Sequence, residues 1–519
     1  MISVNKSSIE YGDYQTPVSF VARVCEKLSS FYDLNPNIVF EPTFGKGSFL
    51  DGIMTVFSEV HTIYGVEINS NYYEIAKSKI ENITTKNVDV QLFNEDIFTF
   101  DFNKLKGNIN REDSLLVIGN PPWVTNSQLA AMGSTNLPQK SNYRKYSGLD
   151  AMTGKGNFDI AEYIVLMLLC EFANYNCTIA MLCKTIVAKN IMRDAKHYPF
   201  SIASMDLFTF DANEVFGANC DAGLLVVRLG DTPKETCSVY DFDSDDYIRE
   251  FGWHDNYFYA NMQNLGNSIN INGNCQFEWR QGIKHDCSKV MELVVEDSGS
   301  FRNGFGDIHD FDVGRFLYPI IKSSDIKSHT ISQTRKYVII SQKRINENTD
   351  HIEVEDPLIW EYLQKHETFL SARKSSIYKN SPKYSIFGIG DYSFSKYKVG
   401  ISGFYKEPLF TLAMGEIPIM MDDTCYFLSF DDVSSAAITL AMLNHPICNS
   451  FLKAIAFLDS KRPYTKEILQ RIDLGKLSEF VDFQYINDYI GSQPIECSLT
   501  ETDYISYCLS LKAAQLALF

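Results

Sequence analysis

The segment Asn120-Pro121-Pro122-Trp123 combines residue types that could hold an amino group in place for reaction. It directly follows the apolar run 115–119, which predicts a buried strand. The two prolines fix the backbone, so the Asn120 side-chain oxygen and the Pro121 carbonyl can both accept hydrogen bonds from one target. Such a pair suits a planar amino group, whose lone pair it frees for attack on an electrophilic methyl group. Trp123 offers a face on which a planar base can stack, worth roughly 1–3 kcal/mol.

A turn that contains two glycines follows another apolar run near the start of the chain. In residues 38–53 this run ends at Glu41, and Gly45 and Gly47 then precede a helix-like segment. Glycines at a strand-to-helix turn let a ligand approach the backbone closely. Taken alone, the pattern is more often an ordinary tight turn.

Acidic residues end the next two strand-like runs. Glu67 lies twenty residues after Gly47, an offset at which a carboxylate can accept hydrogen bonds from both ribose hydroxyls of a nucleoside-containing cofactor. Asp96 could accept a hydrogen bond from an adenine amine while Ile97 packs on the ring. Each acid alone would also suit a solvated strand end or loop, but the matched offsets favour a nucleoside site.

The first 230 residues alternate β-branched runs with amphipathic stretches, which is typical of a mostly parallel sheet flanked by helices. Strands are predicted at 38–41, 62–66, 88–93, 115–119, 177–183, 203–209 and 223–229. Helices are predicted at 18–31, 48–58, 70–81, 158–173 and 185–196. The last two strands lie close in sequence and should form an antiparallel hairpin. The pattern predicts an α/β fold with a Rossmann-like, seven-stranded sheet.

A second domain is expected because 519 residues exceed what one hydrophobic core usually organises. After about residue 235 the chain becomes rich in Asn, Asp, Ser and Gly among aromatic residues. We therefore divide it into domains 1–235 and 236–519. The second domain should be α+β. Its predicted strands are 337–341, 409–412 and 425–429, and its predicted helices are 434–445 and 447–457.

Positive charge is concentrated in residues 373–406, which we call the basic island, within a protein of net charge -18. The overall charge argues against indiscriminate coating of nucleic acid. Interleaved basic and aromatic side chains in the island suit DNA contact, although a solvated surface with core aromatics would look similar. Lys461 and Arg462 are a second, weaker phosphate candidate. The residues predicted to contact DNA are Lys374, Lys379, Lys396 and Lys398.

The cysteines do not indicate disulfides or zinc. The twelve are scattered without a CxxC pair, so we interpret them as reduced thiols. The cluster His285-Asp286-Cys287 lacks a second ligand pair at zinc-site spacing, and no metal is predicted. No signal sequence or membrane span is apparent, so a soluble, cytoplasmic protein is expected.

Over about residues 11–230 the chain resembles the gamma-type N6-adenine DNA methyltransferases. In that family the cofactor motifs come first, the Asn-Pro-Pro-aromatic motif follows, and target recognition lies C-terminal. The segments that match are 12–17, 38–53, 63–69, 92–98, 115–126, 154–169 and 214–229. Segments 281–293 and 315–326 are similar to the family's target-recognition part, less specifically.

The resemblance implies S-adenosylmethionine as cofactor, with contacts that we transfer by position. Glu41 and Gly45 would line its amino-acid moiety, and Glu67 its ribose. Asn120 would stand between cofactor and target amine, and Phe216 would pack against a flipped base opposite Trp123. The other implied cofactor contacts are Thr16, Asp96, Ile97, Asn157 and Phe158.

The expected activity is site-specific methylation of adenine N6 in duplex DNA, as the modification enzyme of a restriction-modification system. The base must be flipped out of the helix to reach such a pocket. The resemblance implies a separate cognate endonuclease, and we expect a monomer on DNA. The alternatives are N4-cytosine or RNA adenine methylation and a non-catalytic DNA specificity protein. Protein glutamine methyltransferases share an Asn-Pro-Pro-Tyr motif but lack a large C-terminal domain.

Overall fold

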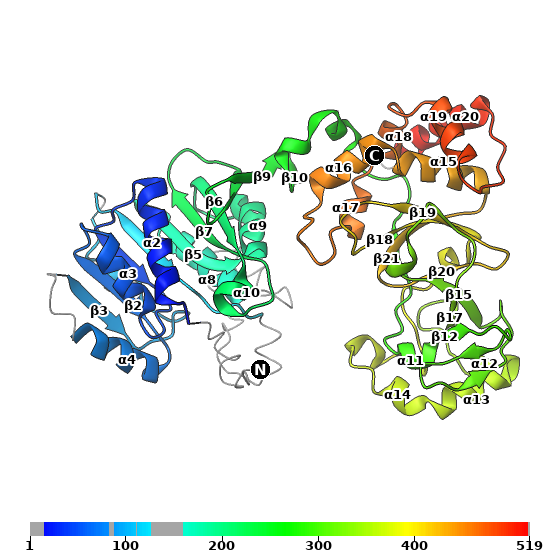
Figure 1. Cartoon of the computed structure of the whole chain (residues 1–519), viewed down its shortest axis with the longest axis horizontal. Coiled ribbons are helices and arrows are strands. Elements are labelled where there is room, and N and C mark those ends of the chain that lie inside the picture. Colours follow the sequence, from blue (N-terminus) through cyan, green and yellow to red (C-terminus); the bar gives the residue numbers. More distant parts are fainter. Residues whose placement is uncertain (1–14, 82–87, 111, 126–158, 517–519) are drawn as a thin grey trace. The chain divides into compact units, whose positions relative to one another are not determined.

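The computed structural model describes residues 15–81, 88–110, 112–125 and 159–516, which fall into two compact units. Unit 1 ends at Met262, and unit 2 runs from Gln263 to Phe519. Figure 1 shows a large twisted sheet in unit 1 and two smaller sheets in unit 2. None of the helices in the described ranges has the length and apolar content that a bilayer span requires.

The sheet of unit 1 has the strand order β10-β9-β8-β6-β7-β5-β4-β1-β2-β3. Strands β1 to β5 are parallel to one another, and β7 runs antiparallel between β5 and β6. The strands that precede residue 235 match all seven predicted segments to within a residue. They are β1 (Ile38–Glu41), β2 (Thr62–Val66), β3 (Asp89–Phe93), β4 (Leu115–Gly119), β5 (Cys177–Lys184), β6 (Ile202–Phe210) and β7 (Ala222–Leu229).

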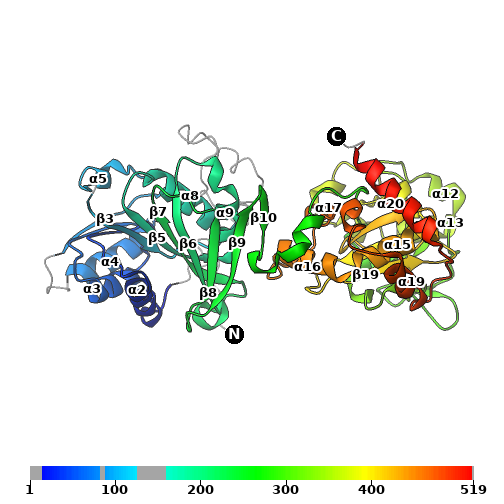
Figure 2. The same ribbon diagram turned by 90° about the horizontal axis from the view of Figure 1, so that it is seen from above.

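Helices cover both faces of this sheet, as the apolar strands require. Strands β1 and β4 are buried along their whole length, as expected for parallel strands covered on both faces. Figure 2 shows α2, α3 and α4 on one face and α5, α8 and α9 on the other. Their bounds are α2 (Val18–Tyr32), α3 (Ser48–Val56), α4 (Ser70–Glu81), α5 (Asn103–Lys106), α8 (Ile160–Glu171) and α9 (Thr185–Asp194).

The sheet continues beyond the predicted seven strands, which corrects both the strand number and the domain boundary. Three further strands extend it: β8 (Thr236–Asp241), β9 (Tyr247–His254) and β10 (Tyr257–Tyr259). Strand β8 pairs in parallel with β6, and β9 and β10 follow as an antiparallel meander. Unit 1 therefore ends at Met262 and not at residue 235, because these strands complete the hydrogen bonding of the β6 edge.

Unit 2 contains two sheets, each with its own helices. The five-stranded sheet has the order β11-β21-β18-β19-β16, and helix α15 packs against three of its strands. The six-stranded sheet has the order β14-β13-β12-β17-β15-β20, and α12, α13 and α14 contribute to its apolar core. A short turn joins β20 to β21 and so connects the two sheets.

The predicted elements of unit 2 are present with small shifts. The strands of its five-stranded sheet are β11 (Arg280–Gln281), β16 (Thr330–Ile331), β18 (Tyr397–Ser402), β19 (Phe410–Met414) and β21 (Cys425–Phe430). Those of its six-stranded sheet are β12 (Glu292–Val295), β13 (Phe301–Arg302), β14 (Ile308–His309), β15 (Leu317–Ile321), β17 (Lys336–Ile339) and β20 (Met420–Met421). The helices of eight or more residues are α13 (Pro357–Lys365), α15 (Val433–Leu443), α16 (Pro446–Ile455), α19 (Phe483–Gly491) and α20 (Glu501–Leu516). Shorter helices are α11 (Ser288–Met291), α12 (His351–Glu355), α14 (Glu367–Ser371), α17 (Lys466–Gln470) and α18 (Leu474–Leu477).

Candidate active site

A pocket lies at the carboxyl ends of β1, β2, β3 and β4, where parallel α/β sheets usually bind ligands. Together with the open solvent at its mouth, it takes in about 970 Å³ of free space. Most of the predicted cofactor residues line it together. They are Thr16, Glu41, Gly45, Glu67, Asp96, Ile97 and Asn120.

The glycine turn after β1 is held against the end of β2 by Glu67. Gly45 and Gly47 have φ of 54° and 72°, in the left-handed region that glycine adopts without strain. The Gly45 N–H donates to Glu67 Oε2 at 2.9 Å, and the Asn69 N–H donates to Oε1 at 2.7 Å. Each carboxylate oxygen can accept more than one hydrogen bond, so Glu67 can shape the turn and still bind a hydroxyl in the pocket.

Glu41 is a buried carboxyl at the inner end of the pocket. The residue is 1% exposed, and its Oε2 has no hydrogen-bond partner among the described residues. Burial, together with the nearby Glu67, raises the pKa of Glu41 well above its ordinary value, while Lys79 partly opposes this. Burying a charged carboxylate without a cationic partner costs free energy. The position of Glu41 therefore suits a ligand that brings a positive charge.

Thr16, which lies near the start of the described residues, orients the Asn120 side chain. The Asn120 amide nitrogen donates to Thr16 Oγ at 3.2 Å. Because the nitrogen faces Thr16, the side-chain oxygen is on the other branch of the amide and can act as the acceptor toward a target. Asp96 caps the turn after β3 by accepting from the Phe98 N–H at 3.0 Å, and Ile97 is buried.

Trp123 and Phe216 lie side by side and contact one another, whereas the expected arrangement has a flipped base between them. Their ring centroids are 5.1 Å apart at an interplanar angle of 76°, an edge-to-face contact. Trp123 is only 5% exposed, and its indole N–H donates to the Leu182 carbonyl at 3.0 Å. A base can stack between these rings only if they separate. Pro122 lines the pocket, and Trp123 and Phe216 lie outside its lining.

An ion pair beside the Asn-Pro-Pro-Trp segment was not predicted from the sequence. Lys184 at the end of β5 donates to Asp159 Oδ2 at 2.9 Å, and Asp159 is buried. Asp159 also caps α8 and forms a β-bridge with Thr125, so the pair anchors the chain that leaves the Trp123 position. An Asp immediately before a helical run is a recognisable N-cap signal, but the Lys184 partner has no local signal.

The remaining predicted cofactor residues, Asn157 and Phe158, lie outside the described residues. Neighbouring Glu162 in α8 is buried and accepts from the Asn190 amide at 2.7 Å. Burial raises the pKa of Glu162 to about 7.

Among the lysines of the basic island, Lys374, Lys379 and Lys396 are exposed in unit 2. Lys398 is not, and its assignment as a phosphate contact is corrected. It is 1% exposed within β18, its ammonium donates to the Ser395 carbonyl at 2.6 Å, and burial lowers its pKa to about 7. Every residue of β18 from Lys398 to Ser402 is buried, so DNA phosphates cannot reach this side chain.

Comparison with known proteins gives one relative that extends over nearly the whole chain. The Type II methyltransferase M.NspV of Nostoc sp. is 39% identical over 484 residues, which cover 92% of this chain and 99% of M.NspV. The Type IIL restriction-modification enzyme MmeI, solved in complex with DNA, has a similar fold with a TM-score of 0.51. The similarity covers 99% of this chain and 80% of MmeI, at 12% identity. No family model matches. The chain belongs to the Type II methyltransferases and is a DNA methyltransferase of restriction-modification systems.

Proposed function

We propose that the protein methylates the exocyclic N6 of adenine in a short duplex DNA sequence, with S-adenosylmethionine as the methyl donor. The observation that carries the proposal is the position of Asn120 on the wall of the pocket, with its amide turned by Thr16. This arrangement aims an acceptor from the Asn-Pro-Pro-Trp segment at the border of a nucleoside-sized site.

The residues of the pocket fit this cofactor. When bound, the cofactor supplies an electrophilic methyl group. The buried carboxyl of Glu41 would bind its ammonium group, and the Gly45 turn would leave room for its amino-acid moiety. Glu67 would hold the ribose hydroxyls, while Asp96 and Ile97 would bind the adenine ring.

The reacting amine is positioned by the Asn-Pro-Pro-Trp segment. The Asn120 side-chain oxygen and the Pro121 carbonyl each accept a hydrogen bond from one of its two N–H groups. These bonds keep the nitrogen lone pair directed at the methyl group. Duplex adenine reaches this position only after flipping, at a cost of a few kcal/mol. The indole face of Trp123 stacks the flipped base after the edge-to-face contact with Phe216 opens.

The target base is tested by identifying the methylated nucleoside. Duplex DNA and RNA of mixed sequence are incubated with the protein and isotope-labelled S-adenosylmethionine, digested, and analysed by mass spectrometry. Label in N6-methyldeoxyadenosine is expected. Label in N4-methylcytosine or only in RNA would replace the adenine assignment, and a protein that selects DNA sequences without any transfer would be a specificity protein.

Duplex DNA is the proposed partner of unit 2, which makes up most of the segment expected to carry target recognition. MmeI, whose fold is similar, was solved in complex with DNA. A separate cognate endonuclease and a monomeric state on DNA are further parts of this proposal.

Cofactor binding should depend on pH through Glu41. Since its pKa is raised in the free protein, Glu41 must release a proton to bind an ammonium group. The affinity is therefore expected to rise with pH and to level off above that pKa. Glu41→Gln should bind more weakly and with a flatter pH dependence. Calorimetry across a pH series measures both, and an unchanged slope in Glu41→Gln would remove the assignment.

The exposed lysines of the basic island should determine the salt dependence of DNA binding. On duplex DNA, log K falls with log salt by about 0.9 per phosphate contact. Changing Lys374, Lys379 or Lys396 to alanine should make the slope shallower by about one unit each. Lys512→Ala, which removes an exposed lysine paired with Glu479, is the control. If all three variants keep the wild-type slope, the island is not the phosphate-binding surface.

A further inference from the structure

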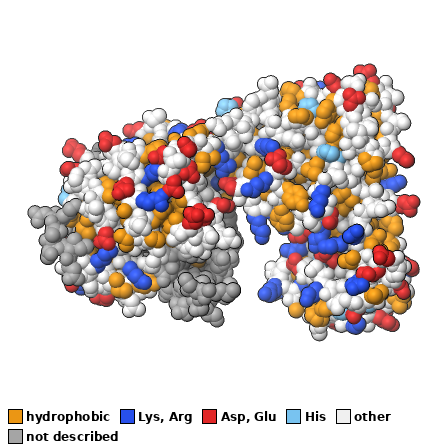
Figure 3. Space-filling view, viewed as in Figure 1, with side chains coloured by type: hydrophobic (Ala, Val, Ile, Leu, Met, Phe, Trp, Pro, Cys, Tyr) orange, Lys and Arg blue, Asp and Glu red, His pale blue; other side chains and the backbone are white. Residues whose placement is uncertain are grey.

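A partly exposed group of polar residues lies at the turn that joins β20 to β21, and the cofactor pocket does not account for it. It consists of Gln281 from β11, Asp423 from the turn, and Arg462 from the segment before α17, and we call it the turn cluster. Figure 3 shows Lys and Arg side chains gathered in the middle of unit 2, at the level of β15 and β20. The three residues of the turn cluster come from segments that are far apart in the sequence.

Hydrogen bonds to the backbone carbonyl of Asp423 position the side chains of Gln281 and Arg462. The Asp423 carbonyl accepts from Gln281 Nε2 at 2.7 Å and from Arg462 Nη1 at 3.2 Å. Arg462 Nη2 lies 3.7 Å from Asp423 Oδ2, and the guanidinium lies over the Phe404 ring, 4.9 Å from its centroid. Even so, Gln281 is exposed and the Arg462 side chain is 32% exposed.

The turn itself is fixed by a charge network directly beneath it. Asp422 is buried, and its Oδ1 accepts from the Thr424 N–H at 3.0 Å and from the Thr424 hydroxyl at 2.5 Å. The ammonium of Lys322 lies 3.5 Å from Asp422 Oδ2 and 2.6 Å from Glu292 Oε1. His285 Nε2 completes the network at 3.2 Å from Glu292 Oε1.

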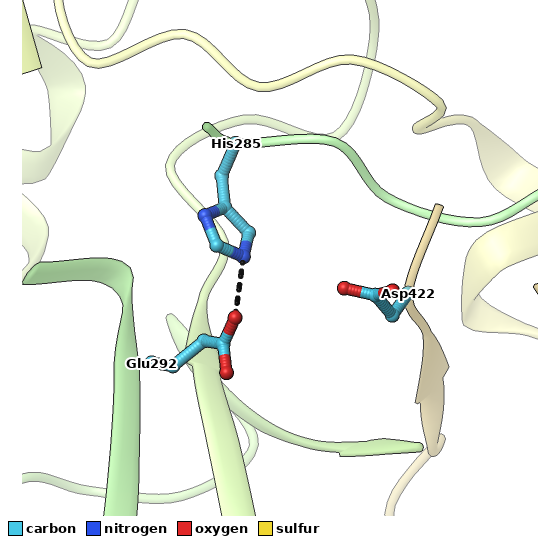
Figure 4. A group of neighbouring side chains, drawn as sticks. All are labelled: His285, Glu292 and Asp422. Atoms are coloured by element: carbon cyan, nitrogen blue, oxygen red, sulfur yellow. Dashed lines mark ion pairs between the residues drawn. The ribbon is translucent and has the colours of Figure 1, made fainter. Parts of the chain in front are cut away.

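Figure 4 shows His285 paired with Glu292 and Asp422 facing them across a short gap. The ligand atoms of these three residues lie within 4.8 Å of one another, an arrangement that could hold a metal ion. Lys322 already supplies the positive charge to both carboxylates. Burial opposes ionisation of Glu292, but hydrogen bonds from His285 and Lys322 outweigh it and lower the Glu292 pKa to about 2. Lys322 thus balances the charge of this group, and Asp422 holds the turn through its hydrogen bonds from Thr424.

The exposed side chains have the chemistry of base recognition. Arginine pairs with guanine O6 and N7 in the major groove, and glutamine pairs with adenine N6 and N7. Such contacts discriminate best when rotamers are locked by a supporting layer, which the Asp423 carbonyl and the buried network provide here. A phosphate contact would need only charge and would not need the ordered Gln281.

We propose that Arg462 and Gln281 contact base edges in the major groove and determine the recognised sequence, with Asp423 as a positioning residue. Arg462 is assigned to a guanine and Gln281 to an adenine. This inference rests on the proposed function, because it takes duplex DNA as the substrate.

The test is a selection on a duplex library with random sequence, read in two ways. Bound duplexes are sequenced, and methylated adenines are mapped separately. Arg462→Ala and Arg462→Lys should both lose the preference for guanine at one position by roughly 5- to 150-fold, because lysine keeps the charge but not the paired donors. Gln281→Ala should relax a different position, while Lys453→Ala, a partly exposed lysine paired with Glu407, should keep the wild-type motif.

The two readouts separate the two proposals. If the wild type selects a motif without methylating adenine, the proposed function fails, and the Arg462 variants still test the inference. The inference is overturned if the Arg462 and Gln281 variants select the wild-type motif unchanged, or if the folded wild type selects no motif at all. Thermal unfolding of each variant confirms that it is folded.

Discussion

Replacing Asn120 by alanine is expected to lower the rate of methyl transfer by at least about 10²–10³-fold, while cofactor affinity stays within a few-fold of wild type. The change removes the side-chain acceptor proposed to hold the target amine. Loss of one preorganised hydrogen-bonding group at a reacting centre costs about 10²–10³ in turnover. The variant also removes the 3.2 Å hydrogen bond to Thr16 that orients the amide. Single-turnover rates on a methylatable duplex, with calorimetric cofactor binding, measure the two effects.

Thr16→Val is the matched comparison for Asn120→Ala. It keeps Asn120 and removes only the hydroxyl that accepts from its amide nitrogen. We expect a smaller loss of turnover than in Asn120→Ala, because the acceptor remains but can rotate. Appreciable turnover by folded Asn120→Ala would exclude Asn120 from the reaction.

Glu67→Ala should act in the opposite way, on cofactor binding rather than on the target base. Hydrogen bonds to a charged group are worth about 1.5–3 kcal/mol, so losing those to the ribose should weaken binding roughly 10- to 150-fold. The Gly45 turn should also loosen, since its N–H bonds to Glu67 Oε2. The measurement is calorimetric titration with S-adenosylmethionine. Glu95→Ala is the control, because Glu95 also lines the pocket but pairs with Lys104. Equal affinities of Glu67→Ala and wild type would show that Glu67 does not hold the cofactor.

The first seven strands could be predicted from the sequence because most of them are short apolar runs that end at a distinct turn. Strand β4 is a clear case, since 115–119 is fully buried and is followed by Asn120 and then two prolines. Strands β8 to β10 could not be recognised in the same way. Parts of β9 and β10 are exposed at the edge of the sheet, so their sequences carry the polar residues that we attributed to a new domain.

The sequence could bring Glu41, Gly45 and Asn120 to one pocket because each lies at or just after the end of a predicted strand. Features that depend on contacts between distant segments could not be predicted. The Lys184–Asp159 pair spans separate elements. The burial of Lys398 depends on how β18 packs, and local charge composition does not contain that information. The contact of Trp123 with Phe216 is likewise a property of packing.

The continuation of the catalytic sheet into β8, β9 and β10 determines where the chain can be cut. Strand β6 pairs with β7 on one side and with β8 on the other. A fragment that stopped at residue 235 would leave the β8-facing edge of β6 unpaired, and an open edge of this kind invites pairing between molecules. Phe251 and Tyr259, both buried, would also be lost. A self-sufficient catalytic fragment therefore has to extend at least to Met262.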